Sequence, residues 1–374
     1  MNILILRPAL ALALSFSLAA QAQTAPDRLQ RPSPESAMAG RSPLTAIQTL
    51  GNRQVMVGES GHILLRTADG NLHQANVPVD LLLTAIYFVN DQQGWAVGHD
   101  GVIVHSDDGG QNWKKQLDGN GINALISESA EREANRLRQE SLEHPQDAAR
   151  ATALDNALFA VDDAKAALEG GPARPLLDVW FRDALQGWAV GSYGMLLATI
   201  DGGHSWHYQS GLDNPDRLHL NTVLGLADGT LLVAGEGGKV YRSPDNGVHW
   251  QAGITLGPES IYKLLALKNG EILAMGFGGA LFASHDSGLT WQPLSNPVKV
   301  AVYGGQQLTD GSVLLAGQGG VVLFSDDGEH FKPWRSRSKS SWLGVGQVSS
   351  TQVALIGSSG LQILPLIELK EHLQ

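Results

Sequence analysis

The chain has 374 residues, a formal net charge of −11, 44 glycines, 9 tryptophans and no cysteine. The absence of cysteine excludes disulfide bonds, thiol catalysis and thiolate metal sites. Nucleic acid is not expected as a partner, because phosphate binding needs clustered Lys and Arg and no basic stripe is present in this acidic sequence.

The first 22 residues predict export. Arg7 is the only cation before an apolar run over residues 9–20, and Ala20-Gln21-Ala22 is a small-x-small cleavage signal. The run is shorter than the roughly 20 residues that span a bilayer. We therefore expect cleavage after Ala22 and a periplasmic or secreted mature chain without a transmembrane segment.

Residues 23–43 are predicted to be a linker, marked by Arg31-Pro32-Ser33-Pro34. The region that follows, 44–366, is built from repeats. The frame Ser/Thr-x-Asp-x-Gly-x-x-Trp begins at Ser106 and returns in later copies. Each copy follows an apolar strand that ends in glycine, of the form Gly94-Trp95-Ala96-Val97-Gly98.

Counting these strands predicts an all-β fold, a seven-bladed β-propeller of four-stranded blades. Each blade reads as strand A, turn, strand B, Gly-x-x-Gly turn, strand C, Asp-box turn and strand D. The expected blades cover residues 44–80, 81–117, 176–210, 218–253, 259–295, 299–335 and 340–366.

The aspartates of the repeated frame are predicted to be turn residues rather than catalysts. A carboxylate there can accept backbone N–H groups across the C–D hairpin, while glycine supplies the positive φ that the turn needs. These structural Asp-box residues are Asp108, Asp201, Asp245 and Asp286.

Blade seven has no Asp box, so its outer strand has to come from another segment. Residues 36–44 are the preferred donor, and residues 366–373 are the rival. Without that role, residues 367–374 form a C-terminal tail.

An insertion over residues 119–175 interrupts the repeats between blades two and three. It is rich in Ala, Glu, Arg and Leu and predicts a helical hairpin near 122–143 and 147–169, broken at His144-Pro145. As a D-to-A connection, it should emerge beside the Gly-x-x-Gly turns. One face of the second helix is expected to carry Leu154, Leu158, Val161 and Leu168.

The Asp boxes and the Gly-Trp-Ala-Val-Gly strands resemble the BNR-repeat propellers, and most closely the photosystem II stability/assembly factor family. The family's GWAVGxxGxIxxSxDGGxxW blade is matched almost literally at Gly94–Trp113 and Gly187–Trp206. The resemblance implies a non-catalytic exported scaffold, without a cofactor, that binds protein partners belonging to a membrane-associated complex. Photosynthesis, or an envelope complex or transporter, would be its setting.

A partner-binding face is predicted where the Gly-x-x-Gly turns meet the insertion, because the residues at their variable positions are mostly dissimilar between blades. Those residues are Glu59, His99, Ser192, Tyr193, Glu236, Phe277, Gln318 and Ser358. A secondary patch is predicted at Arg335, Arg337 and Trp342.

Glycoside hydrolysis is the alternative function, because Asp boxes also occur in sialidases. That resemblance implies three arginines on a substrate carboxylate, a Tyr–Glu nucleophile pair, an Asp acid and an Arg-Ile-Pro motif. The motif is absent, and Tyr193, Tyr262 and Tyr303 have no evident acidic partner in the sequence. No metal site is expected, because alternation along a strand places His204 and His207 on opposite sides.

Overall fold

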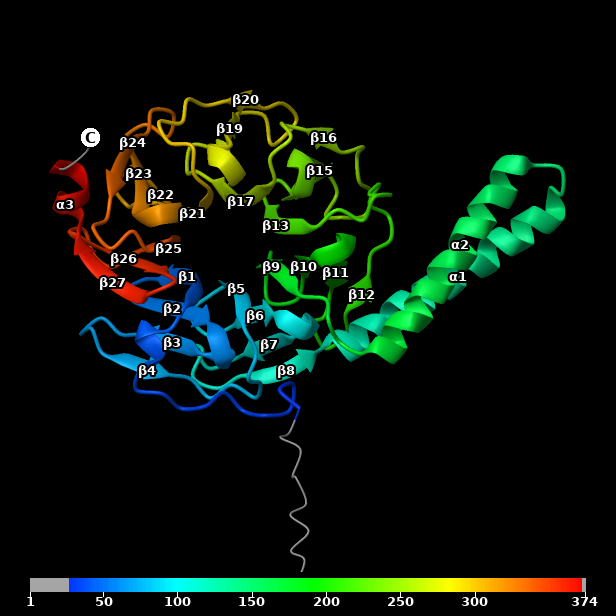
Figure 1. Cartoon of the computed structure of the whole chain (residues 1–374), viewed down its shortest axis with the longest axis horizontal. Helices are drawn as coiled ribbons and strands as arrows, with labels where there is room; N and C mark the ends of the chain where they lie inside the picture. Colours follow the sequence, from blue (N-terminus) through cyan, green and yellow to red (C-terminus); the bar gives the residue numbers. More distant parts are fainter. Residues whose placement is uncertain (1–26, 372–374) are drawn as a thin grey trace, which may run out of the picture.

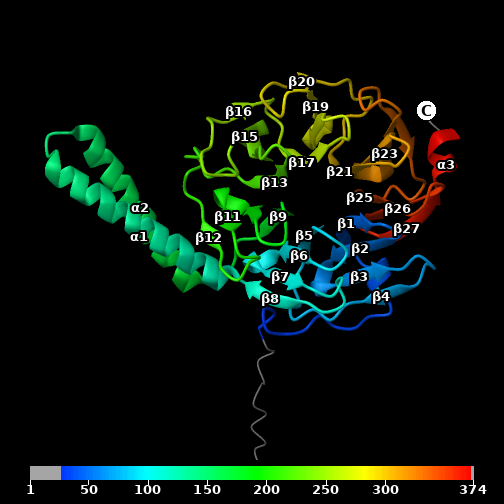
Figure 2. The same ribbon diagram turned by 180° about the vertical axis from the view of Figure 1, so that it is seen from behind.

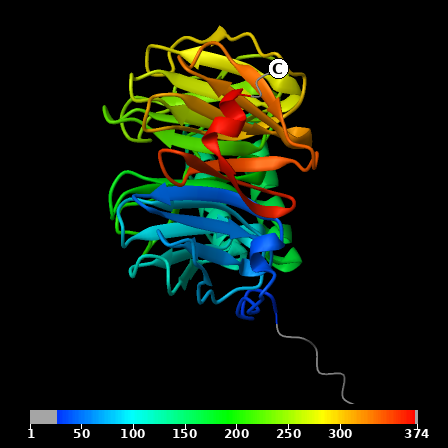
Figure 3. The ribbon, with the colours of Figure 1, turned by 90° about the vertical axis from the view of Figure 1, so that its left-hand side faces the viewer.

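The computed structural model describes residues 27–371, so the predicted signal peptide lies outside the described residues. In this part of the chain, seven antiparallel sheets surround a common axis in a propeller-like disc, and a helical hairpin projects from the rim (Figure 1). The reverse view shows the same arrangement (Figure 2), and Figure 3 shows the disc edge-on. None of the helices within these residues is long and apolar enough to cross a bilayer.

Each sheet is a meander in which the first strand is innermost, and the inner strands of successive sheets lie side by side. The first sheet contains β1 (Leu44–Leu50), β2 (Arg53–Gly58), β3 (Ile63–Arg66) and β4 (Leu72–Gln74). The second contains β5 (Leu83–Phe88), β6 (Gly94–Gly98), β7 (Ile103–Ser106) and β8 (Lys114–Leu117). The third contains β9 (Leu176–Phe181), β10 (Gly187–Gly191), β11 (Leu196–Thr199) and β12 (His207–Tyr208). The fourth contains β13 (Leu220–Gly225), β14 (Leu231–Gly235), β15 (Lys239–Ser243) and β16 (Ile254–Thr255).

The fifth sheet contains β17 (Ile261–Ala266), β18 (Ile272–Gly276), β19 (Leu281–Ser284) and β20 (Gln292–Pro293). The sixth contains β21 (Val302–Gln307), β22 (Val313–Gly317), β23 (Val321–Ser325) and β24 (Lys332–Arg335). The seventh contains only β25 (Trp342–Gln347), β26 (Gln352–Gly357) and β27 (Gly360–Pro365). Strand β25 lies beside β1, so the last sheet is a neighbour of the first.

The expected fourth strand of the last sheet is not formed by either predicted donor. Residues 36–44 contain a short 3-10 helix, η1 (Ala39–Arg41), which contacts β27. The C-terminal segment forms α3 (Leu366–Glu371), which packs on β23 and β27 (Figure 3). Leu366 and Leu369 are buried in the core between the sixth and seventh sheets, so burial of a helix face replaces strand pairing here.

The glycine that ends each second strand is required by a close backbone approach. An ideal Cβ on Gly276 would lie 2.0 Å from the carbonyl oxygen of Ser260, the residue before β17. The φ of Gly276 is −169°, an extended value open to any residue, so crowding alone demands glycine. The same crowding recurs at Gly58, Gly98, Gly191, Gly235, Gly317 and Gly357. In every blade the next residue donates its backbone N–H to that carbonyl, as Phe277 does to Ser260 at 2.9 Å.

Polar residues of the inner strands join neighbouring sheets near the axis. Thr45 Oγ1 donates to the carbonyl of Leu83 at 2.6 Å, and Thr84 Oγ1 donates to that of Leu176 at 2.7 Å. Each of these threonines sits at a register irregularity of its inner strand, which turns the side chain toward the next sheet.

The core lies between the sheets rather than in one central mass. Trp95 of β6 stacks on Phe181 of β9 with ring centroids 3.6 Å apart, and Trp206 meets Phe181 edge-on. All three rings are at least 95% buried. Aromatic pairs of this kind contribute about 0.5–1.5 kcal/mol beyond their buried area.

The Asp boxes form tight turns between the third and fourth strands. In the second sheet, Asp108 Oδ1 accepts the backbone N–H groups of Gln111 and Asn112, both at 3.0 Å, and the hydroxyl of Ser106 at 2.9 Å. Desolvation alone would raise the pKa of Asp108, but these hydrogen bonds outweigh it and lower the pKa to about 2. The equivalent backbone donors to Asp201, Asp245 and Asp286 are Ser205, His249 and Thr290.

Residues before β1 pack against the disc and do not form a free linker. Leu29 is 2% exposed in the core of the first two sheets. Arg28 and Arg31 both pair with the carboxylate of Asp80, and Ser33 N–H donates to the carbonyl of Val77 at 2.9 Å.

The insertion forms the predicted hairpin, with α1 (Gly119–Glu143) and α2 (Ala148–Gly170). Asp118 and Asp147 cap the two helices by accepting backbone N–H groups of their first turns. The expected leucine face is only partly buried, because Leu158 and Leu168 are 37% and 45% exposed. Val161 and Leu154 of that face do pack against α1, together with Ala157, which was not predicted.

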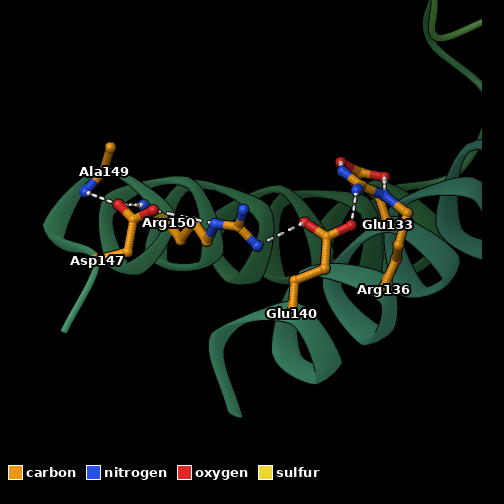
Figure 4. Close-up of polar contacts among 6 residues, drawn as sticks. All are labelled: Glu133, Arg136, Glu140, Asp147, Ala149 and Arg150. Atoms are coloured by element: carbon orange, nitrogen blue, oxygen red, sulfur yellow. Dashed lines mark hydrogen bonds and ion pairs between the residues drawn. The ribbon is translucent and has the colours of Figure 1, made fainter. Parts of the chain in front are cut away.

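Charged residues join the two helices from the middle of α1 to the end of the hairpin distant from the disc (Figure 4). Arg136 of α1 pairs with Glu133 and Glu140 of the same helix, and Glu140 also lies 3.9 Å from Arg150 of α2. Arg150 pairs in turn with the α2 cap Asp147 at 3.0 Å. Because these side chains are exposed to solvent, their ion pairs add little to the stability of the protein.

Candidate partner-binding surface

One face of the disc carries the turns between second and third strands. In the seventh sheet residues 358–359 form a simple turn. In the other six sheets these are 3-10 turns, and their second residue has a φ between 53° and 67°. They are η2 (Glu59–Gly61), η3 (His99–Gly101), η4 (Ser192–Gly194), η5 (Glu236–Gly238), η6 (Phe277–Gly279) and η7 (Gln318–Gly320). Helix α1 contacts η3, so the hairpin and these turns share this face.

Most of the residues predicted for this surface are solvent-accessible. His99, Tyr193, Glu236, Phe277, Gln318 and Ser358 are exposed, and Glu59 is partly exposed. Tyr193 and Phe277 are the large apolar members, at 55% and 56% exposed. Ser192 does not belong to the surface, because it is 3% exposed and its hydroxyl donates to the carbonyl of Pro175.

The secondary patch is also only partly at the surface. Arg335 and Arg337 are exposed where β24 leads toward β25. Trp342, predicted as their neighbour in the patch, is 1% exposed. It is the first residue of an inner strand and lies in the core between the sixth and seventh sheets. At the surface, the secondary patch therefore consists of Arg335 and Arg337 alone.

A cavity of about 320 Å³ lies where the hairpin joins the disc. Three segments of the same face enclose it: the base of the hairpin, the turn η4, and the connection from β12 toward β13. Apolar and polar side chains both line it. The lining residues are Ile126, Ser129, Ala130, Glu133, Ala157, Ala160, Asp163, Arg174, Tyr193, Gly194, Met195, Tyr208, Gln209, Ser210, Leu212, Asn214, Pro215 and Arg217.

Two arginines meet one carboxylate at the wall of this cavity. Asp163 of α2 accepts a hydrogen bond from Arg217 at 2.6 Å, and Arg174 lies 3.8 Å from the same oxygen. The guanidinium of Arg174 also lies 5.6 Å from the ring centroid of Tyr193, and His219 meets that ring edge-on. Glu133 also lines the cavity, so the formal charges of the two carboxylates and the two guanidinium groups balance, and the guanidinium of Arg174 is the one beside the exposed tyrosine.

The same two arginines affect the pKa of the nearby Tyr208. Burial raises the pKa of the Tyr208 hydroxyl, while Arg217 and Arg174 act in the opposite direction. The cavity thus combines an aromatic ring, a half-buried phenol and a wall that carries two arginines and two carboxylates. Such an arrangement can hold an extended peptide segment or an anionic group by an arginine fork and aromatic contact.

Sequence reasoning identified Tyr193 but missed Arg174, Arg217 and Asp163. Asp163 and Arg174 lie in the insertion between β8 and β9, Arg217 lies in the connection from β12 to β13, and their spacing has no motif. The positive φ of Arg217, 50°, and the hydrogen bonds by which Asn214 holds Leu218 depend on the folded loop. The one available signal was that both are D-to-A connections, which lie on the same face as the B-to-C turn that holds Tyr193.

A second, smaller cavity of about 180 Å³ lies on the axis among the inner strands. Within the described residues, its charged lining consists of Asp178 and Lys263, which pair with each other at 2.7 Å. Asp178 also accepts the hydroxyl of Thr222 at 2.8 Å. Tyr262 and Tyr303 stack on each other with centroids 5.6 Å apart. The charged and aromatic side chains that line this axial cavity therefore pair with each other.

Residues 169–360, just over half of the chain, match the family model described as "Photosynthesis system II assembly factor YCF48". The chain belongs to this YCF48 family. Residues 104–115 also match the BNR/Asp-box repeat, which places the second-sheet Asp box in that repeat class. No curated protein matches the sequence.

Solved structures show the likeness of fold. A structure titled "YCF48 bound to D1 peptide" has a TM-score of 0.57 at 15% identity, covering 87% of this chain and 93% of that one. YCF48 from Cyanidioschyzon merolae has a TM-score of 0.55 at 16% identity, covering 89% and 97%. The WD40 propeller domain of Doa1 is similar too, with a TM-score of 0.58 at 10% identity and coverage of 90% and 95%. At these identities the likeness establishes a propeller-like fold.

Proposed function

We propose that this member of the YCF48 family is an exported, non-catalytic assembly factor that binds a protein partner on the face shared by the hairpin and the turns η2–η7. We further propose that its seven sheets form a closed, seven-bladed ring that acts as a rigid platform. Contacts between β1 and β25, and the hydrogen bond from Thr49 Oγ1 to the Gln347 carbonyl at 3.0 Å, support closure.

The cavity at the base of the hairpin carries the proposal. It places an exposed tyrosine and two arginines that share one carboxylate beside apolar walls, on the face that the insertion enlarges. Tyr and Arg are the residue types that dominate the binding energy of protein interfaces. A YCF48 structure is titled as bound to a D1 peptide. We infer by analogy that a peptide segment of a membrane-associated complex, photosynthetic or belonging to another envelope complex or transporter, occupies this cavity.

Photocrosslinking can test the face directly. A photoreactive phenylalanine analogue replaces Tyr193 or Phe277 on the proposed face, and Val248 or Leu289 in Asp-box turns on the opposite face. Val248 and Leu289 are 69% and 54% exposed, so they match in accessibility. Irradiation in the native envelope should give one discrete partner from the first pair only. Equal crosslinking from the second pair would contradict the proposed face.

Shortening the hairpin tests the contribution of the arm. Removing all of residues 120–171 is geometrically simple, because an ideal Cβ on Gly119 would lie 2.6 Å from Cβ of Pro172. That deletion also removes Ile122, which is 1% exposed in the core of the second and third sheets, so a lower Tm is expected. A truncation of residues 134–157, closed by a short Gly/Ser turn, keeps this anchor and most of the cavity.

We expect both shortened proteins to fold and the larger deletion to lose the crosslinked partner. The Arg217→Ala variant tests the cavity without changing the arm. Undiminished capture by both the full deletion and Arg217→Ala would refute the proposal. Cleavage after Ala22 is checked by the N-terminal sequence of the mature protein from a cell-envelope fraction.

The absence of catalysis is proposed on the arrangement of the axial cavity. Sialidase-like chemistry needs three arginines converging on a carboxylate and a Tyr–Glu pair, whereas the charged lining of the cavity in residues 27–371 is the mutually paired Asp178 and Lys263. Hydrolysis of a fluorogenic sialoside at an enzyme-like rate by the purified chain would contradict this part of the proposal.

A further inference from the structure

Three side chains with metal-binding atoms converge on the disc face opposite the hairpin. Glu271 immediately precedes β18, His285 lies in the turn after β19, and Glu329 lies in the turn between β23 and β24. One ligand atom from each lies within 4.8 Å of the other two. The cluster therefore bridges the fifth and sixth sheets.

The buried member of the cluster is incompletely satisfied. Glu271 is 4% exposed, and its Oε2 accepts only a long hydrogen bond from Asn269 Nδ2, at 3.3 Å. Its Oε1 is buried and has no hydrogen-bond partner in residues 27–371. A buried carboxylate oxygen without a donor is costly, and buried charges are normally paired or coordinate metals.

The fold does not require a carboxylate at this position. In the fifth sheet, the carbonyl of Glu271 closes the turn between the first two strands by accepting the N–H of Leu267. In five other sheets the same backbone bond is made by residues with neutral side chains: Gln93, Gln186, Thr230, Ser312 and Gln352. The charge of Glu271 is therefore a local feature of this blade.

We propose that Glu271, His285 and Glu329 bind a divalent first-row transition metal ion, with Zn²⁺ as the best match. Zn²⁺ accepts imidazole nitrogen and carboxylate oxygen ligands at about 2.0–2.2 Å in tetrahedral geometry, and water completes the fourth position. Ligand atoms then lie roughly 3.3–3.6 Å apart, the edge of that tetrahedron. In the structure the ligand atoms lie within 4.8 Å of one another, and rotation of the exposed His285 and Glu329 side chains can bring them to the tetrahedral spacing. Mg²⁺ and Ca²⁺ fit less well, since they prefer six or more oxygen ligands.

The ion would act as a clamp between neighbouring sheets. Its ligands come from both sheets, and Gly328 lies so close that an ideal Cβ there would be 3.7 Å from Glu271 Oε2. Bound metal would neutralise the buried carboxylate and join two Asp-box turns across the sheet boundary. The site lies on the face away from the hairpin, so it is independent of the proposed partner-binding surface.

Calorimetric titration of the mature, tag-free chain with ZnCl₂ tests the site. We expect one bound ion and a Tm that rises by a few degrees when Zn²⁺ is about 100-fold above its Kd. Glu271→Gln keeps the side-chain shape and removes the buried charge, so it should abolish the zinc response without lowering the Tm of the metal-free protein. His285→Ala changes an exposed residue and should also abolish the response.

His249→Ala is the matched control, because His249 is an exposed histidine of the Asp-box turn in the fourth sheet. This variant should bind Zn²⁺ like the unmodified chain. Because His285→Ala alters only an exposed side chain, it remains informative even if Glu271→Gln fails to fold. Unchanged zinc affinity in His285→Ala would overturn the proposal, as would the absence of both binding heat and a Tm shift with Zn²⁺ and Co²⁺ at millimolar concentration.

Discussion

Replacing Asp108 by Ala removes the acceptor on which the Asp-box turn of the second sheet depends. Its carboxylate accepts two backbone N–H groups, the Ser106 hydroxyl and the side-chain amide of Asn112 at 2.7 Å. Gln111 and Asn112 are exposed, so water can replace the carboxylate at their N–H groups, but the Ser106 hydroxyl is buried. We therefore expect a loss of about 2 kcal/mol, within the 1–3 kcal/mol typical of an unsatisfied buried group.

This loss converts into a measurable shift in melting temperature. An unfolding entropy of about 2.1 cal/mol/K per residue gives roughly 0.7 kcal/mol/K for a mature chain of about 350 residues. The expected decrease in Tm is therefore about 3 °C, measured by differential scanning calorimetry.

The neighbouring Asp107 provides a control in the same turn. Asp107 is exposed, and its one ion pair, to Lys114, is long at 3.8 Å. Asp107→Ala should leave Tm within about 0.5 °C, as expected for a weak surface pair. Equal shifts in the two variants, or no shift in Asp108→Ala, would refute the view that hydrogen bonds to the turn make the Asp box stabilising.

The remaining predictions concern pH, backbone crowding and the hairpin tip. The pKa of Asp108 is lowered to about 2 from 3.8, so its stabilisation is present above pH 4 and disappears as the pH falls toward 2. The urea midpoints of the unmodified chain and of Asp108→Ala should therefore converge between pH 4 and pH 2. A constant difference between the two midpoints would contradict the mechanism. Gly276→Ala should lower Tm by several degrees although the φ of Gly276 is extended, because the new Cβ would meet the Ser260 carbonyl. Gly211→Ala is the control and should leave Tm unchanged, because no atom lies within 4 Å of an ideal Cβ there. Similar melting curves for the two variants would refute the crowding argument. Glu140→Gln at the hairpin tip should change Tm by less than 1 °C, because its ion pairs are exposed, and a larger shift would show that the network is more than a surface feature.

The repeat made most of the fold predictable from sequence. Each Gly-terminated strand and each Asp box marks a fixed place in a blade, and the strand boundaries follow these markers closely. The same logic failed for the last sheet, where the absence of an Asp box predicted a borrowed strand. No local pattern distinguishes an outer strand from the short helix α3, because both bury leucines against the sixth and seventh sheets.

The candidate site was less predictable, because its parts are joined by folding alone. Turn positions located Tyr193 and Phe277 on the face that the hairpin shares, since loop order in a meander fixes the face. Ser192 and Trp342 appeared equally suitable in the sequence, but the Ser192 hydroxyl bonds to the Pro175 carbonyl of its own blade, and Trp342 lies in the core between the sixth and seventh sheets. The pairing of Arg174 and Arg217 with Asp163 depends on how the hairpin leans over the third sheet, and that tilt has no signature in residue spacing.

Gly119 and Pro172 lie side by side, so the chain enters and leaves the long hairpin at one narrow point. Helix α1 has 25 residues, so at 1.5 Å per residue it is roughly 37 Å long. A rotation of about 5° at its base displaces the distal end by roughly 3 Å, comparable to a hydrogen-bond length. The cavity is built against that base, and Asp163 and Arg217 join its two sides. An occupant that separated this pair would remove a tie between the arm and the disc, and at this arm length a small tilt would be largest at the tip.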